Sequence, residues 1–311
     1  MTKDEIEDYI DAVIKHSLSM VEYSNFFLTE IKGLAEDALD ECNKKLLEYK
    51  NGFTKRKKKE VEADIQEILA DLEARVEDFV SEQLIEIAEN EEKYLHDVVE
   101  KALGVKLVIP AIAVGILSLV PIASAGSAED FGANITDRLG RIYDSVINCG
   151  YTFAEDYEDI LDDYEGQFGA FERGLDADSE TLGYSLSDMY DRIVYTKNDK
   201  KIKGYIWSSM LDTSTCLACG SLDGTKYENI SDVLMYPAHD RCRCKLIPYN
   251  EEIEDMIPES YSKWFEKQSD KDKYKILGKK RFELYEQGMK IKQFVNNGKI
   301  TPLKDLKNQK D

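Results

Sequence analysis

Residues 216–244 read CLACGSLDGTKYENISDVLMYPAHDRCRC, and they hold four of the six cysteines and one of the three histidines of the chain. The stretch opens on a Cys-x2-Cys pair and closes on His-x2-Cys-x-Cys after a gap of nineteen residues. Thiolate and imidazole are the ligands that zinc prefers, and a two-residue spacing lets two sulfurs reach one ion from a tight turn. The stretch therefore predicts a structural zinc site. Its candidate ligands are Cys216, Cys219, His239 and Cys242, with Cys244 as a less usual fifth.

Two other chemistries stay open for these cysteines. Disulfides would form if the protein ends outside a cell, and a catalytic thiol or zinc would need a general base that the sequence does not assign. The N-terminus, MTKDEIEDYIDAV, is acidic and has no apolar core of the kind that a secretory signal carries. We therefore expect the chain to be made in a reducing cytoplasm, where clustered cysteines bind metal more often than they pair.

Around the cysteines, residues 205–250 show the signals of short strands and loops. Turn residues occur at Leu222-Asp223-Gly224-Thr225 and at Tyr236-Pro237. The gap between the two ligand groups is long enough for a β-hairpin with Asp223-Gly224 at its tip. We predict a small zinc-binding β-hairpin element here, followed by a helical tail over residues 259–308.

The N-terminal third has helical periodicity. Residues 4–50 predict one helix or two, and residues 55–101 predict a second long helix, each with an apolar stripe and an acidic opposite face. Neither helix can bury its own stripe, so we predict a helical hairpin over residues 1–102. His16 and His96 fall on these helices and are interpreted as ordinary surface or packing residues.

Residues 103–126 differ in composition from the charged helices before them, because the nineteen residues 107–125 contain no charged side chain. At about 1.5 Å per residue, a helix of this length approaches the roughly 30 Å hydrocarbon thickness of a bilayer. Pro110, Gly115 and Pro121 weaken a straight buried helix but are tolerated in membrane segments. The segment predicts either insertion into a membrane or a core hairpin, and the sequence does not decide between the two.

Residues 127–311 form the last predicted region, which begins with further helical periodicity. Gly166, Gly169, Gly174 and Gly183 are expected to loosen the segment before the cysteines. Taken together, the regions predict a mostly α protein. Long N-terminal amphipathic helices come first, and an α+β C-terminal module with the Cys/His element follows them.

The composition narrows the classes of function. The net charge is −21, from 62 acidic and 41 basic residues, so we expect no specific nucleic-acid sequence recognition. The basic run at 55–59 is expected to be a solvated helix start between acidic helices.

No HExxH, Walker loop or Gly-x-Ser-x-Gly occurs in the sequence, and we therefore predict no enzyme activity. Cys42 and Cys149 are interpreted as small hydrophobic side chains on helices.

A specific order of uncommon residues surrounds the cysteines. Trp207 is followed by Asp212, by Thr-Cys-x2-Cys at 215–219 and by the Leu-Asp-Gly turn at 222–224. The stretch closes with Pro-x-His-x2-Cys-Arg-Cys at 237–244. In this order the residues resemble the signature of the phage Mu F-like minor head proteins, also called phage head morphogenesis proteins.

The resemblance covers about residues 130–308, since the tail from Trp264 to Leu303 is also similar to the helical end of that family. Ser214 departs from the family, which usually has an arginine between the aspartate and Thr-Cys. Residues 1–125 lie outside the resemblance.

The resemblance implies a virion component, made in the bacterial host cytoplasm and present in few copies near the portal vertex. Such proteins are linked to head assembly, DNA packaging or exit, and sometimes to delivery into the cell with the genome. Portal and other head proteins are the implied partners. In that setting residues 107–125 would serve membrane passage during ejection. The alternative expectation is a membrane-active effector that enters or crosses a bilayer through this segment.

Overall fold

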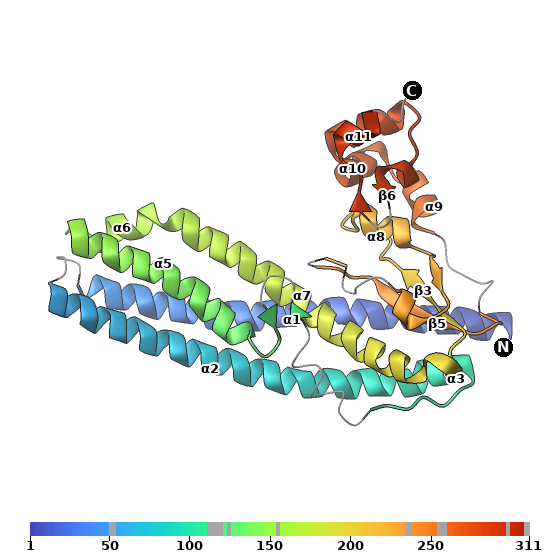
Figure 1. The fold of residues 1–311 in the computed structure, drawn as a ribbon, viewed down its shortest axis with the longest axis horizontal. Helices are drawn as coiled ribbons and strands as arrows, with labels where there is room; N and C mark the ends of the chain where they lie inside the picture. Colours follow the sequence, from blue (N-terminus) through green and yellow to red (C-terminus); the bar gives the residue numbers. More distant parts are fainter. Residues whose placement is uncertain are drawn as a thin grey trace. The chain divides into compact units, whose positions relative to one another are not determined.

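The computed structural model describes residues 1–49, 54–110, 121–122, 126–153, 156–233, 238–239, 241–253, 260–296 and 299–307. The chain forms two compact units. Unit 1 comprises Met1–Ser19, Glu91–Pro110 and Asp191–Asp311, and unit 2 comprises Met20–Asn90 and Ala111–Tyr190. Helices dominate and a small sheet lies toward the C-terminus, so the predicted mostly α class with an α+β C-terminal part is confirmed (Figure 1).

Both predicted N-terminal helices are present. Helix α1 is a single helix over Lys3–Leu47, and α2 runs over Lys55–Tyr94. A π-helical turn, η1 (Leu95–Val99), and the short α3 (Glu100–Leu103) continue α2 as far as Gly104. Gly104 has a φ of 66°, and glycine is common at this C-terminal position because it adopts positive φ without strain.

Within unit 2, α1 and α2 are antiparallel. The ring of Phe27 on α1 lies 5.2 Å from the ring of Phe79 on α2. Tyr23, one turn earlier on α1, donates a hydrogen bond to the side chain of Gln83, one turn later on α2. The apolar stripes predicted for the two helices therefore meet, which buries side chains that neither helix could cover alone.

Three further helices complete the helical framework. They are α5 (Phe131–Phe153), α6 (Tyr157–Asp163) and α7 (Glu165–Asn198). An antiparallel pair, β1 (Pro121–Ile122) with β2 (Gly126–Ser127), precedes α5. In unit 2, α5 and α7 lie alongside α1 and α2 (Figure 1). The buried side chains of α5 recur every three or four residues and include Ile135, Leu139, Ile142, Val146 and Ile147.

The expectation that four glycines loosen the segment before the cysteines is wrong, because α7 runs through all of them. Two of these glycines lie where another helix comes very close. A β-carbon on Gly183 would stand 2.8 Å from the Cα of Ser24, and one on Gly174 would stand 2.2 Å from Nη2 of Arg138. Close contact with the backbone of α1 therefore explains Gly183, although a glycine costs roughly 1 kcal/mol in helix propensity, whereas the neighbour of Gly174 is the end of the Arg138 side chain.

Gly183→Ala is expected to destabilise the protein by about 1–3 kcal/mol, because the new methyl group would push against the backbone of Ser24. Gly166→Ala is the matched control on the same helix, since its β-carbon would have no neighbour within 4 Å. The control should stabilise the protein by up to about 1 kcal/mol. Denaturant midpoints of the two variants measure the contrast, and a shift of the same sign in both would contradict the close approach.

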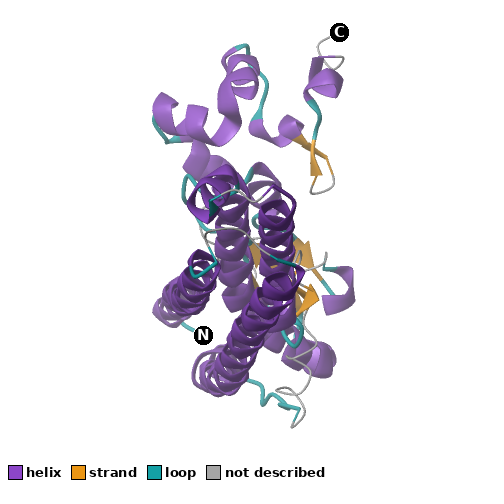
Figure 2. Ribbon diagram, turned by 90° about the vertical axis from the view of Figure 1, so that its left-hand side faces the viewer, coloured by secondary structure: helices purple, strands orange, loops and turns teal. Residues whose placement is uncertain are grey.

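Unit 1 contains a three-stranded antiparallel sheet in the order β4-β3-β5. Its strands are β3 (Gly204–Ser208), β4 (Lys226–Tyr227) and β5 (Lys245–Tyr249), and the 3₁₀ turns η2 (Asp199–Lys201) and η3 (Ile230–Asp232) lie before β3 and after β4. Strands β3 and β4 are antiparallel neighbours, but helix α8 (Leu217–Leu222) lies between them in the chain. Asp223-Gly224 is therefore the link from α8 to β4 rather than the tip of a tight hairpin. Strands are a small part of the molecule (Figure 2).

The tail packs around its own apolar cluster and around α8. It comprises α9 (Tyr261–Glu266), α10 (Asp270–Glu286), η4 (Ile291–Phe294), β6 (Val295–Asn296), β7 (Lys299–Ile300) and α11 (Leu303–Lys307). The buried cluster consists of Leu217, Tyr261, Phe265, Leu277, Met289, Phe294 and Leu306. Because Leu217 is the first residue of α8, this helix is anchored in the core of the tail.

Most of the uncharged segment at 107–125 lies outside the described residues, namely 111–120 and 123–125. At its start, the backbone N–H of Val108 donates to Asn198 Oδ1 and the Val108 carbonyl accepts from Asn198 Nδ2, both at 2.8 Å. Among the helices that the structure describes, none has the length and apolar character needed to cross a membrane.

Candidate metal centre

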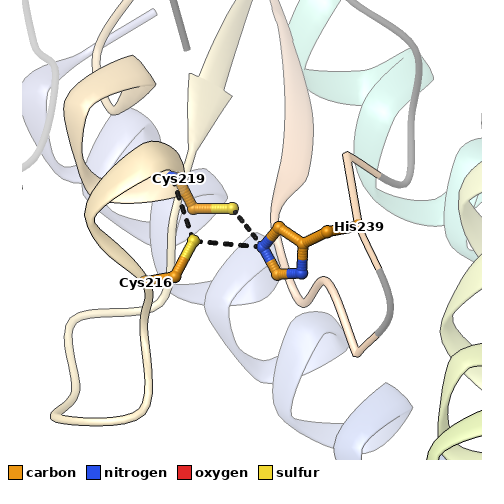
Figure 3. A group of neighbouring side chains, drawn as sticks. All are labelled: Cys216, Cys219 and His239. Atoms are coloured by element: carbon orange, nitrogen blue, oxygen red, sulfur yellow. Dashed lines mark hydrogen bonds between the residues drawn. The ribbon is translucent and has the colours of Figure 1, made fainter. Parts of the chain in front are cut away.

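The Cys-x2-Cys pair occupies the first turn of α8. Cys216 precedes the helix with extended backbone angles (φ −72°, ψ 158°), and its sulfur accepts a hydrogen bond from the backbone N–H of Cys219 at 3.4 Å. The sulfur thus takes the place of an oxygen in an ordinary N-terminal cap. This cap turns both sulfurs toward the same side of α8, where they point at the ring of His239 (Figure 3).

All five predicted ligands come together. Nε2 of His239 lies 3.1 Å from Sγ of Cys216 and 3.0 Å from Sγ of Cys219. The Cys219 sulfur also lies 3.9 Å from that of Cys242. Cys219, Cys242 and Cys244 form a second group whose sulfurs lie within 4.8 Å of one another, so Cys219 belongs to both groups. The cluster can hold a metal ion, as the spacing predicts.

The distances fit a tetrahedral site closely enough to need little movement. With Zn–S bonds of about 2.3 Å and Zn–N bonds of about 2.0–2.1 Å, two sulfurs lie about 3.8 Å apart and a sulfur and a nitrogen about 3.6 Å apart. The separation of 3.9 Å between the sulfurs of Cys219 and Cys242 matches the first value. The His239 nitrogen would move outward by about half an ångström to reach the second.

Hydrogen bonding among the four thiols favours the thiolate form of Cys216 and Cys242 and the protonated form of the other two. The pKa of Cys216 is lowered to about 4, because its sulfur accepts hydrogen bonds from the side chains of Cys219 and His239. Cys219 and Cys244 lower the pKa of Cys242 to about 2 in the same way. The pKa values of Cys219 and Cys244, the thiols that partner them, are raised. A bound cation would take the place of the remaining protons, since thiolates are the metal ligands.

Asp212 and Arg243 hold the two halves of the cluster together. Arg243, which stands between Cys242 and Cys244, donates through Nη1 and Nη2 to the two carboxylate oxygens of Asp212 at 2.6 and 2.8 Å. The same carboxylate accepts the backbone N–H of Thr215 at 2.9 Å, just before α8 begins. Burial raises the pKa of Asp212, but the hydrogen bonds and charge of Arg243 outweigh burial and leave this pKa below its usual value.

The stabilisation by Asp212 is expected to depend on pH. Because its folded-state pKa lies below the unfolded value of about 3.9, the contribution is present above about pH 5 and is lost as the pH falls through the folded-state pKa. The difference in melting temperature between wild type and Asp212→Asn should therefore be constant from pH 5 to 8 and shrink below about pH 4. Glu228→Gln, at an exposed position, is the control. A difference in melting temperature between wild type and Asp212→Asn that grows in acid would contradict the ion pair.

Asp223 of the Leu-Asp-Gly turn joins the sheet to the tail. Its two carboxylate oxygens accept the backbone N–H groups of Ser209, at the end of β3, and of Tyr261, at the start of α9, both at 2.7 Å. Gly224, with a φ of 76°, directs the chain back so that its N–H donates to the carbonyl of Trp207 at 2.8 Å. A β-carbon on Gly220 would stand 2.4 Å from the Tyr261 ring, so α8 and the tail are in direct contact.

The cysteines and histidines outside the cluster lie in different surroundings. Cys42 is completely buried, and so it packs as a small hydrophobic side chain. His96 is half exposed and pairs with Glu100 on its own helix, as a surface histidine does. His16, by contrast, lies in a buried polar cluster. In the sequence, the burial of His16 is indicated by its position in the apolar stripe of α1, between the buried Val13 and Met20.

No family model matches this chain, and no match was found among the curated proteins or the solved structures. What the chain does is therefore inferred from its own residues.

Proposed function

We propose that this chain is a phage minor head protein of the Mu F-like kind, with a structural and interaction role near the portal. It would act in head assembly, DNA packaging or exit, be carried in the virion, and have no catalytic role. The proposal rests on the resemblance in residues 205–250, which the fold supports through the contacts of the same residues.

One observation carries the proposal: the residues of the signature are those that hold together the sheet and the tail of unit 1, which form the C-terminal module. Asp212 binds Arg243, Asp223 binds the backbone at Ser209 and Tyr261, and the five ligands form one cluster. A carboxylate that is paired with an arginine, or whose oxygens already accept two backbone N–H groups, is poorly placed to act as a general base. These contacts favour a metal with a structural role, and the thiolate-rich ligand set favours zinc.

The proposed role predicts specific binding to a portal ring encoded by the same genome. Purified full-length protein, loaded with zinc, should bind the assembled ring, and mass spectrometry of purified virions should find the chain in few copies per particle. Cys149→Ser should bind as wild type does, whereas Cys219→Ser should bind less, because it unfolds the module. Absence from virions together with no binding to the ring would refute the proposal.

The uncharged run at 107–125 supports a second candidate, a membrane-active effector. Full-length protein would then release dye from anionic lipid vesicles, and Ile116→Asp, which places a charge near the middle of the run, would abolish release. Vesicles that stay intact with wild-type protein would exclude this activity.

A further inference from the structure

A second cluster of ligand-type side chains lies in unit 1. His16 comes from α1, Glu91 from α2 and Asp191 from α7, and a ligand atom of each lies within 4.8 Å of the others. Nε2 of His16 is 3.0 Å from Oε2 of Glu91. The Glu91 side chain is fully buried, and the side chains of His16 and Asp191 are only 10% and 7% exposed. Three helices that are far apart in sequence thus bring imidazole and two carboxylates to one buried point.

Two carboxylates buried at one point are costly unless positive charge faces them. Nζ of Lys245, on β5, lies 3.9 Å from Oδ2 of Asp191, near the upper limit for an ion pair. A divalent cation among the three side chains would bring positive charge to the point where both carboxylates meet the imidazole.

Tyr195 provides an independent sign of a ligand. Tyr195 lies one helical turn after Asp191 on α7, so the two side chains share a face of that helix. Burial raises the pKa of Tyr195, and the nearby groups Asp191, Tyr94, Tyr9 and Glu91 raise it further. The residue is 1% exposed, and its hydroxyl oxygen has no hydrogen-bond partner among the residues that the structure describes. A buried hydroxyl in this state is costly, and a cation beside it would give its oxygen a partner.

The imidazole is held in place for such a role. The ring of Tyr94 stacks on the ring of His16, with centroids 3.7 Å apart and planes inclined by 6°. This stacking fixes the imidazole plane while Nε2 faces Glu91. Tyr94 is also the last residue before the π-helical turn η1, and such turns occur frequently at functional sites.

We propose that His16, Glu91 and Asp191 bind a divalent first-row metal ion, with the hydroxyl oxygen of Tyr195 beside it as a further ligand. The mixed imidazole and carboxylate set differs from the thiolate cluster and suits manganese, iron(II) or zinc. The site is independent of the proposed role at the portal, because none of its residues belongs to the signature around the cysteines.

Manganese is the suitable probe, since it prefers oxygen ligands over thiolates. Reduced full-length protein would first receive one equivalent of zinc to fill the cysteine cluster. The protein would then be titrated with Mn²⁺, and bound ions would be counted from the loss of the free-ion signal in electron paramagnetic resonance. We expect about one saturable ion per chain. Glu91→Gln should weaken Mn²⁺ binding at least tenfold, whereas Glu92→Gln, on the exposed side of the same helix, should leave it unchanged.

Two results would overturn the proposal. One is wild-type protein that shows no saturable Mn²⁺ binding. The other is a Glu91→Gln variant that binds Mn²⁺ as tightly as Glu92→Gln does, which would assign binding to surface carboxylates. If Glu91→Gln does not fold, Asp191→Asn takes its place, and the wild-type titration alone still decides against the site when no ion binds.

Discussion

Cys219→Ser is expected to abolish metal binding and to unfold the sheet and the tail of unit 1. Cys219 belongs to both ligand groups, with its sulfur 3.0 Å from the His239 nitrogen and 3.9 Å from the Cys242 sulfur. Structural zinc sites contribute about 10–16 kcal/mol of binding free energy, which is comparable with the roughly 5–15 kcal/mol that stabilises a whole domain. The sheet and the tail should therefore lose protection from hydrogen exchange, while the helices of unit 2 keep theirs.

Cys149→Ser is the matched control, because Cys149 lies on α5 in unit 2, far along the chain from the cluster. It should retain its zinc and its exchange protection. A Cys219→Ser protein that keeps both zinc and a protected C-terminal module would show that the sulfur of Cys219 is not a ligand.

Arg138→Met should destabilise unit 2 by about 3–5 kcal/mol, because it leaves the carboxylate of Asp178 in the core without its arginine. Nη1 of Arg138 donates to Oδ2 of Asp178 at 2.5 Å, and the Asp178 side chain is only 3% exposed. Methionine keeps much of the apolar contact that the arginine makes with the ring of Phe171. The loss of stability in Arg138→Met therefore measures the effect of removing the positive charge. Urea denaturation monitored by circular dichroism gives the change in the free energy of unfolding.

Arg141→Met, three residues further along α5, separates this effect from a general loss of charge. Arg141 is exposed and pairs with the exposed Asp137 at 3.6 Å. A surface pair of this kind contributes less than about 1 kcal/mol. Equal destabilisation by the two substitutions would mean that the buried pair has no special role in the stability of unit 2.

The helical framework could be predicted because its signal is local. An apolar residue every three or four positions specifies one face of a helix, and this was sufficient for α1, α2 and α5. The five residues that cluster as candidate ligands could also be named from sequence, since the Cys-x2-Cys spacing fixes two sulfurs on one turn. In both cases, neighbouring residues in the chain carry the information.

Features that depend on distant residues could not be predicted. The glycines of α7 suggest a weak helix until the backbone of Ser24 is placed 2.8 Å from the β-carbon position of Gly183. Asp223 suggests only a turn, although its carboxylate joins β3 to the start of α9. The helical pattern around His16 indicates only an ordinary surface or packing residue, because the contact of His16 with Glu91 joins positions on two different helices.

The most direct test of the structural metal site is the release of zinc during thiol modification of the reduced full-length protein. About one zinc per chain should leave in step as the four thiols of residues 216–244 react with a mercurial reagent. The module should unfold as the zinc leaves. Four reactive thiols without any zinc released, or the same cysteines found as disulfides in protein purified under reducing conditions, would contradict a structural zinc centre.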